Sequence, residues 1–285
     1  MTINMAGYIN NTCITENTDN TDINDNDKVD IAGNIGNAGT DTKHFVRDNE
    51  RVDDLMRDGL KLIQRPDIFC FGIDAVLLST YAKANKGETV LDMCTGNAVI
   101  PILMQSKNPQ TCYQAMEIQD ISVELARRNV AYNNLNDKIN IIQGDIKEAS
   151  KICGGASFNV VTCNPPYMNE NHGIVNPESA KAIARHELMC SLSDVLREAS
   201  KCLKVKGRLY MVHRPHRLVD IFNEMREYHL EPKRIRLVYP YINKPANMVL
   251  IEAVKCGKSQ LIVEEPLIVY NSDGSYTKEL EAMYE

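Results

Sequence analysis

Four consecutive residues, Asn164-Pro165-Pro166-Tyr167, combine hydrogen-bonding groups with a stiff backbone. They follow the apolar run 158–163, so they stand where a strand passes into a loop. Each proline fixes its own φ at about −65° and biases the residue before it toward extended conformations. The Asn164 carboxamide offers an acceptor and donors, the Pro165 carbonyl offers a second acceptor, and Tyr167 offers a ring for stacking. This set predicts a site for an exocyclic amino group on a flat molecule, with a simple proline-rich turn as the structural alternative.

Acidic and small residues stand at the ends of three further predicted strands. The stretch 89–98 reads as a strand, a tight turn of small residues and the start of a helix, where backbone N–H groups can approach a nucleoside or a carboxylate. Glu117 ends the next strand, where its carboxylate can accept hydrogen bonds from two ribose hydroxyls. Asp145 ends the third, where it can accept from an adenine amino group while Ile146 covers the ring. A lone acid at such a position is ordinarily a surface residue, but the joint pattern predicts a ligand site. Its candidate residues are Asp92, Cys94, Gly96, Asn97, Glu117, Ile118, Asp145, Ile146 and Asn164.

Strand and helix patterns alternate along the chain from residue 72 onward. The predicted strands cover 89–93, 113–117, 139–143, 158–163 and 207–213. The predicted helices cover 72–84, 101–106, 121–134, 192–203 and 215–229. This alternation is typical of an α/β fold with a doubly wound, mostly parallel sheet covered by helices on both faces. In such sheets ligands bind at the carboxyl ends of the strands, where the candidate residues stand.

Two short strand pairs flank this alternation. Residues 234–239 and 248–254 predict an antiparallel hairpin at the sheet edge, which makes seven strands in all. Residues 60–64 and 68–71 predict a small hairpin before the first helix.

The first fifty residues differ in composition from the remaining 235. They hold nine acidic and three basic residues, which accounts for the entire formal net charge of −6. They are rich in Asn, Thr and Asp and show no periodic apolar pattern, so burial cannot offset the entropy of ordering them. The sequence therefore predicts a disordered acidic tail over 1–50 and one folded domain over 51–285.

Compartment and metal content follow from what the sequence lacks. No apolar run approaches the roughly 18 residues of a membrane span, and no basic segment followed by an apolar one suggests a signal peptide. The nine cysteines form no Cys-x-x-Cys pair and mostly lie in apolar segments, as reduced core thiols do. We therefore expect a cytoplasmic protein with neither a membrane anchor nor a metal site.

The order of strand ends resembles the class I S-adenosylmethionine-dependent methyltransferases, and the Asn-Pro-Pro-Tyr segment resembles those that act on an amino or amide nitrogen. Over residues 51–285 the resemblance narrows to the bacterial tRNA1(Val) adenine-N6 methyltransferase family. It is carried by residues 71–78, 181–187, 210–215, 246–250 and 270–277. It implies a Rossmann-like fold, S-adenosyl-L-methionine as cofactor, and tRNA as substrate, methylated at N6 of the adenine 3′ of the anticodon. It also implies catalytic roles for Asn164, Pro165 and Tyr167.

One departure from the resembled fold concerns its glycine-rich loop. The usual pattern is Asp-x-Gly-x-Gly-x-Gly, whereas Cys94 and Ala98 stand at the first and third glycine positions and Gly96 is kept at the second. A positive φ at Cys94 would cost about 1–2 kcal/mol, which is not prohibitive. Two alternatives stay open: a glutamine-N5 methyltransferase acting on release factors, and a non-catalytic paralogue that binds the cofactor or RNA.

A local excess of positive charge lies between residues 197 and 236, a segment that contains eleven basic and five acidic residues. Such a segment can line an RNA-binding face, although solvated helix faces look the same. Arg185, His186, Arg214 and His216 fall in loops at the edge of the sheet that carries Asn164, and they are better candidates for RNA contact. The sequence does not predict whether the protein self-associates.

Overall fold

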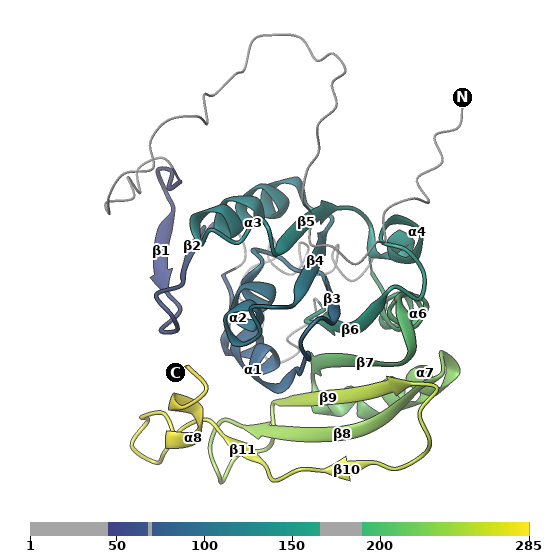
Figure 1. Cartoon of the computed structure of the whole chain (residues 1–285). Coiled ribbons are helices and arrows are strands. Elements are labelled where there is room, and N and C mark those ends of the chain that lie inside the picture. Colours follow the sequence, from purple (N-terminus) through teal and green to yellow (C-terminus); the bar gives the residue numbers. More distant parts are fainter. Residues whose placement is uncertain (1–44, 68–69, 166–189, 285) are drawn as a thin grey trace, which may run out of the picture.

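The computed structural model describes residues 45–67, 70–165 and 190–284. Within these residues, nine strands form one sheet in the order β10-β8-β9-β7-β6-β3-β4-β5, with β11 also paired to β8 (Figure 1). The strands are β3 (Thr89–Met93), β4 (Cys112–Glu117), β5 (Ile139–Gln143), β6 (Phe158–Cys163), β7 (Leu203–His213), β8 (Leu230–Tyr239), β9 (Met248–Lys255), β10 (Ile262–Val263) and β11 (Leu267–Ile268). Neighbours from β5 to β7 are parallel, whereas β9 is antiparallel to β7 and β8. The mostly parallel α/β fold with its antiparallel hairpin is confirmed, and two very short strands extend it.

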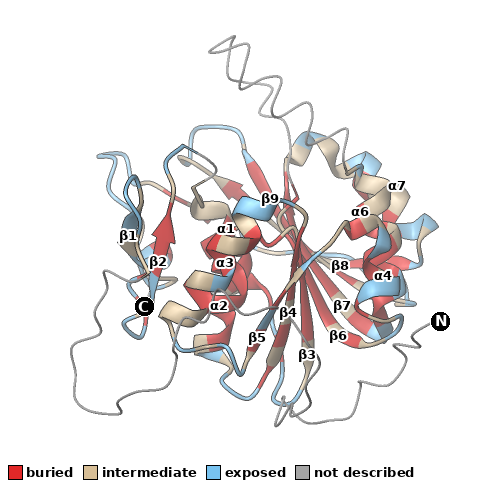
Figure 2. Ribbon diagram, turned by 90° about the horizontal axis from the view of Figure 1, so that it is seen from above, coloured by how far each residue is buried: buried red, intermediate tan, exposed pale blue. Residues whose placement is uncertain are grey.

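Helices cover both faces of the sheet, as Figure 2 shows. One face carries α1 (Ile73–Tyr81), α2 (Val99–Lys107) and α3 (Asp120–Tyr132), and the other carries α4 (Ala149–Ile152), α6 (Leu192–Cys202) and α7 (Leu218–Glu227). Successive side chains of a strand point to opposite faces. Val90 accordingly joins the apolar core under α1 to α3, and Leu91 joins the core under α4, α6 and α7. These two cores fix the strands, and so they fix where the strand ends lie.

Helix α6 begins as the sequence predicts. The Ser191 hydroxyl oxygen accepts from the Asp194 backbone N–H at 3.1 Å, and the Asp194 carboxylate accepts from the Ser191 N–H at 3.1 Å. These reciprocal bonds are a capping box. Other boundaries differ from prediction. β7 starts at Leu203, directly after α6, and the predicted helix 215–229 is a 3-10 turn (Pro215–Arg217) followed by α7.

The N-terminal hairpin has a different partner strand from the predicted one. β2 (Lys61–Gln64) pairs antiparallel with β1 (Arg51–Asp54), whereas residues 68 and 69 lie outside the described residues. The buried side chain of Asn129 on α3 fixes the hairpin. Its oxygen accepts from Ile63 N at 2.7 Å, and its amide nitrogen donates to Ile63 O at 3.1 Å and to Asn97 O at 3.0 Å. One side chain thus joins the hairpin to the loop that follows β3.

Residues 45–50, which the sequence assigned to the tail, pack on α3. The Phe45 ring meets the Tyr132 ring edge-on at 5.5 Å between centroids. Arg128 donates to both carboxylate oxygens of Glu50, each at 2.6 Å, and the Glu50 side chain is only 2% exposed. The contacts with α3 therefore begin before the expected boundary at residue 51.

The chain ends in a small C-terminal unit beside β8. It comprises β10, β11 and α8 (Lys278–Glu281), which Figure 1 shows in yellow. Four tyrosine rings stack in a row there, with centroid separations of 5.4, 5.4 and 6.2 Å. The rings belong to Tyr241, Tyr270, Tyr276 and Tyr284.

Two further observations concern the expected absence of membrane spans and the expected reduced state of the cysteines. In the part of the chain that the structure describes, no helix has both the length and the apolarity needed to cross a membrane. Cys112 is disulfide-bonded, so the expectation of reduced thiols fails at that residue, while the seven other cysteines among the described residues are free.

Candidate active site

The strand register places the ends of four parallel strands side by side. Met93 of β3 pairs with Met116 of β4 and with Cys163 of β6. Glu117 of β4 pairs with Gln143 of β5. The segments that follow these strands therefore lie along one carboxyl edge of the sheet in the order 144–146, 117–118, 94–98 and 164–165.

The loop between β3 and α2 has three residues with left-handed backbone. Cys94, Gly96 and Ala98 have φ values of 57°, 58° and 66°. Glycine adopts such values without steric cost, whereas a residue with a β-carbon pays about 1–2 kcal/mol. Cys94 and Ala98 therefore hold the conformation for which the resembled fold uses glycine. The two substitutions add strain to the loop, but the left-handed backbone is retained at both positions.

Both carboxylate oxygens of Glu117 accept hydrogen bonds from the backbone. Gly96 N donates to Oε2, and Ile118 N and Gln119 N donate to Oε1, each at 3.0 Å. Glu117 thus ties the β3–α2 loop to the end of β4, with only 5% of its surface exposed. A carboxylate accepts about four hydrogen bonds, so one acceptor position remains for a ribose hydroxyl. Two ribose hydrogen bonds would require one of the backbone N–H groups to give way.

Asp145 and Ile146 stand at the start of a 3-10 turn (Ile146–Glu148) after β5. Asp145 Oδ1 accepts from Lys147 N at 2.9 Å, and its other oxygen lies 3.5 Å from Lys147 Nζ. Ile146 is 4% exposed and packs in the core under α6, so it supports the turn from below. Ile118 keeps more of its surface exposed and is the more accessible of the two isoleucines.

Asp92 lies beneath the loop and has no exposed surface. Thr162 Oγ1 donates to Asp92 Oδ1 at 2.6 Å, and Oδ2 has no hydrogen-bond partner among the described residues. Burial raises the pKa of the Asp92 carboxyl to about 7. Asp92 therefore supports the loop from the interior, behind the surface that a cofactor would touch.

Asn164 begins the loop after β6, and its amide is held on one side only. Its Nδ2 donates to Asp74 Oδ2 at 2.9 Å. Its Oδ1 is buried and has no hydrogen-bond partner among the described residues. Pro165 is buried, whereas Pro166 and Tyr167 lie outside the described residues. The arrangement provides one amide oxygen that can accept a hydrogen bond from a bound amino group.

Asp74 is the site residue that the strand-end analysis missed. It lies on α1, 90 positions before Asn164, and no spacing rule links the two. The only signal was its place in the segment 71–78, which carried part of the family resemblance.

The basic segment 197–236 is less free for RNA than its composition suggests. Seven of its eleven basic residues form ion pairs: Arg197, Lys201, Arg208, Arg217, Arg226, Arg234 and Arg236. Lys204, Lys206, Arg214 and Lys233 donate to amide or carbonyl oxygens. Exposed ion pairs contribute only about 0–1 kcal/mol, so a phosphate can replace such a carboxylate at small cost. Arg185 and His186, the other candidates for RNA contact, lie outside the described residues.

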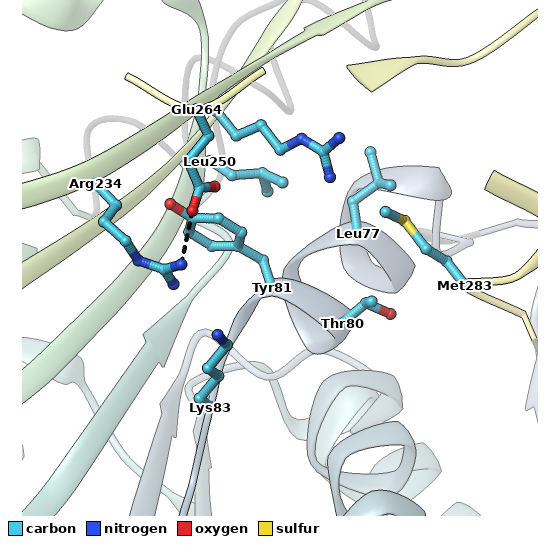
Figure 3. Close-up of a pocket in the computed structure, with 9 residues that line it drawn as sticks. Leu77, Thr80, Tyr81, Lys83, Arg234, Leu250, Glu264 and Met283 are labelled. Carbon is cyan, nitrogen blue, oxygen red and sulfur yellow. Dashed lines mark hydrogen bonds and ion pairs between the residues drawn. The ribbon is translucent and has the colours of Figure 1, made fainter. Parts of the chain in front are cut away.

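A cavity of about 210 Å³ lies beside the C-terminal half of α1 (Figure 3), and Asn164 is not among its lining residues. Tyr81, Arg234 and Glu264 are among the residues that line it. Arg234 pairs with Glu264 at 2.6 Å and with Glu252 at 2.5 Å, and its guanidinium lies 5.0 Å from the centroid of the Tyr81 ring. The positive charge of Arg234 is therefore already neutralised, and the cavity is not part of the site at the strand ends.

The residues at the carboxyl edge fit S-adenosylmethionine. Among the described residues, a β-carbon built on Gly96 meets no atom within 4 Å apart from its chain neighbours, so the loop leaves open space for a ligand against its backbone. Ala98, the N-cap of α2, has no capping side chain, so the first-turn N–H groups can face a carboxylate. Glu117 and Asp145 supply acceptors one and two strands away. No cluster of metal-binding side chains occurs within the described ranges.

Comparison with known proteins also indicates a methyltransferase. The family model for the methyltransferase small domain matches residues 59–229. The tRNA1(Val) (adenine(37)-N6)-methyltransferase of Porphyromonas gingivalis is 28% identical over 216 residues, which are 73% of this chain and 84% of that protein. The enzyme of the same name from Histophilus somni is 31% identical over 142 residues, which are 50% of this chain and 59% of that protein.

The fold also matches a solved methyltransferase structure. A predicted O-methyltransferase from Agrobacterium tumefaciens superposes with a TM-score of 0.61 at 20% identity, covering 74% of this chain and 95% of that one. The family model spans more than half of the chain, and its first and last matched residues enclose every described residue of the candidate site. The chain therefore belongs to the methyltransferase small domain family.

Proposed function

We propose that this enzyme transfers a methyl group from S-adenosylmethionine to N6 of an adenine in tRNA. The observation that carries the proposal is the Asn164 amide, whose oxygen is buried, without a partner among the described residues, at the end of β6. The relatives named tRNA1(Val) (adenine(37)-N6)-methyltransferase support adenine 37 of tRNA1(Val) as the target. A tRNA substrate also supports the expected cytoplasmic location.

The mechanism follows from the electronics of the amino group. The N6 lone pair of adenine is delocalised into the ring, which makes the nitrogen a poor nucleophile. Hydrogen bonds from the two N–H groups to Asn164 Oδ1 and the Pro165 carbonyl favour the form in which the lone pair is localised on nitrogen. S-adenosylmethionine supplies an electrophilic methyl group on its sulfonium. As the N–C bond forms, the methyl–sulfur bond would break and its electrons would stay on sulfur, which leaves S-adenosylhomocysteine. The amino nitrogen becomes positive and then loses a proton to water.

Positioning supplies most of the acceleration in this scheme. The rigid end of β6 holds the acceptor oxygens before the adenine arrives, so little reorganisation is needed during the reaction. Tyr167, beyond the described residues, is assigned the stacking of the base, an interaction of about 1–3 kcal/mol in nucleic-acid sites. The target adenine must leave its stack to enter the site, and a single-stranded loop makes that less costly than a duplex does.

The test is a labelling experiment with the purified protein. It is incubated with methyl-labelled S-adenosylmethionine and unmodified tRNA1(Val) transcript, and the digested RNA is analysed for modified nucleosides. We expect N6-methyladenosine, which disappears when adenine 37 is replaced by guanine. A parallel reaction contains a release factor in place of RNA. Label only in that protein would contradict the proposal and favour glutamine methylation, and no label in either would favour a non-catalytic binding protein.

A further inference from the structure

We propose that Asp74 is a positioning residue for methyl transfer, because it sets the orientation of the Asn164 amide and strengthens its oxygen as an acceptor. The inference rests on the proposed function, since it assigns a task to Asn164 in that reaction. The two side chains meet because the first turn of α1 reaches the end of β6.

The contact determines which end of the Asn164 amide faces the substrate. An ionised carboxylate only accepts hydrogen bonds, so the NH2 group of Asn164 must face Asp74 Oδ2, at 2.9 Å. The oxygen must then point the other way. A reversed amide would bring its oxygen against the carboxylate and present donors to an amino group that needs acceptors. Asp74 therefore excludes the unproductive orientation.

Asp74 is itself held in place. Its second oxygen, Oδ1, accepts from Ala75 N at 3.0 Å within the first turn of α1. The following residues of α1, from Ala75 to Ser79, are buried, which anchors the helix. Gly72, the N-cap, allows the close fit: a β-carbon there would lie 2.8 Å from Asp74 Oδ1. The φ of Gly72 is −109°, so the requirement at this position is for space.

The charge of Asp74 also acts through the amide. A carboxylate bound to the NH2 group polarises the amide and increases the electron density on Asn164 Oδ1, and such charge-assisted hydrogen bonds are roughly twice as strong as neutral ones. Asp74 lies in the first turn of α1, where the positive end of the helix dipole attracts negative charge. Positive charge develops on the amino nitrogen as the methyl group arrives, so a stronger acceptor stabilises the transition state more than the bound substrate.

The experiment compares single-turnover methylation of tRNA with separate binding measurements for S-adenosylmethionine and tRNA. For Asp74→Ala we expect a rate about 100-fold below wild type, because the amide loses its fixed orientation. For the nearly isosteric Asp74→Asn we expect about a tenfold loss, because an acceptor remains but the charge is gone. Both dissociation constants should stay within about twofold of wild type, which a general loss of structure would not allow.

A reciprocal exchange separates orientation from folding. Asn164→Asp places two carboxylates together, and its rate should fall as the pH rises and the shared proton is lost. The double variant Asp74→Asn/Asn164→Asp restores one donor facing one acceptor, with a second oxygen left for the substrate, and should be at least tenfold faster than Asn164→Asp at pH 8. The control is Asp220→Asn, which removes a first-turn acid from α7 and should leave the rate unchanged.

The outcomes distinguish this inference from the proposed function. A wild-type protein that leaves adenine in tRNA unmethylated overturns the proposed function and the inference with it. An active wild type with an equally active, folded Asp74→Ala variant overturns the inference alone. Loss of rate that is matched by loss of cofactor or RNA affinity also overturns it, as does a double variant slower than both single ones.

Discussion

In the proposed reaction Asn164 contacts the substrate and Glu117 contacts the cofactor. Asn164 presents an amide oxygen at the end of β6, and Glu117 holds the β3–α2 loop through Gly96 from the end of β4. The sequence located both residues because Glu117 ends, and Asn164 directly follows, a strand with a clear apolar pattern. It could not locate Asp74, since the contact between α1 and the end of β6 depends on how the helix packs.

We predict that Glu117→Ala raises the dissociation constant for S-adenosylmethionine by about 10- to 150-fold, equivalent to about 1.5–3 kcal/mol. The substitution removes an acceptor for the ribose and leaves Gly96 N without its partner. Titration calorimetry on the folded variant measures this change. Asp137→Ala, at an exposed acid after α3, is the control and should bind normally. Unchanged affinity in Glu117→Ala would show that the ribose lies elsewhere.

Whole elements also divide into those that the local sequence pattern predicts and those that depend on contacts with distant residues. The bounds of β3, β5 and β6 match the prediction to the residue, because these strands are short apolar runs between turn residues. The sequence did not predict β1 (Arg51–Asp54) as the partner of β2, because β1 is polar, with the sequence Arg-Val-Asp-Asp, and owes its pairing to contacts with β2. β10 and β11 have two residues each, too few for any periodic signal.

The β3–α2 loop gives a prediction at this scale, from a pair of opposite substitutions. Cys94→Gly should raise the free energy of unfolding by up to about 1 kcal/mol, because glycine removes the strain of φ 57°. The gain is limited because glycine also increases the conformational entropy of the unfolded chain. Gly96→Ala should lower it by about 1–2 kcal/mol and should also abolish cofactor binding, since the added methyl group enters the open space beside the loop. Urea denaturation and calorimetry measure the two effects. A Gly96→Ala protein that binds the cofactor normally would place the cofactor away from this loop.

For the whole molecule, the composition of the first fifty residues predicts a disordered tail over 1–50, whereas residues within 45–50 contact α3. Phe45 and Glu50 pack on α3, and neither contact has a signature in so polar a sequence. We propose that the folded domain begins near residue 45, and that the residues before it are dispensable for folding and catalysis.

Two truncations test that boundary. Removal of residues 1–44 should leave the melting temperature and the methylation rate unchanged. Removal of residues 1–50 should lower the free energy of unfolding by about 1–3 kcal/mol, because Arg128 then loses its bidentate carboxylate partner. Calorimetric melting of the three proteins gives the comparison. Equal melting temperatures for the two truncations would restore the boundary at residue 51.

The central claim is that the Asn164 amide oxygen accepts from the target amino group during methyl transfer, and Asn164→Ala tests it most directly. An acceptor that acts mainly in the transition state contributes to kcat and little to ground-state binding. We predict that the single-turnover rate on tRNA1(Val) falls by about 100- to 1,000-fold, or roughly 2.7–4 kcal/mol. The dissociation constants for S-adenosylmethionine and tRNA should change by less than about twofold. A folded Asn164→Ala protein that binds both ligands and methylates at the wild-type rate would contradict the account.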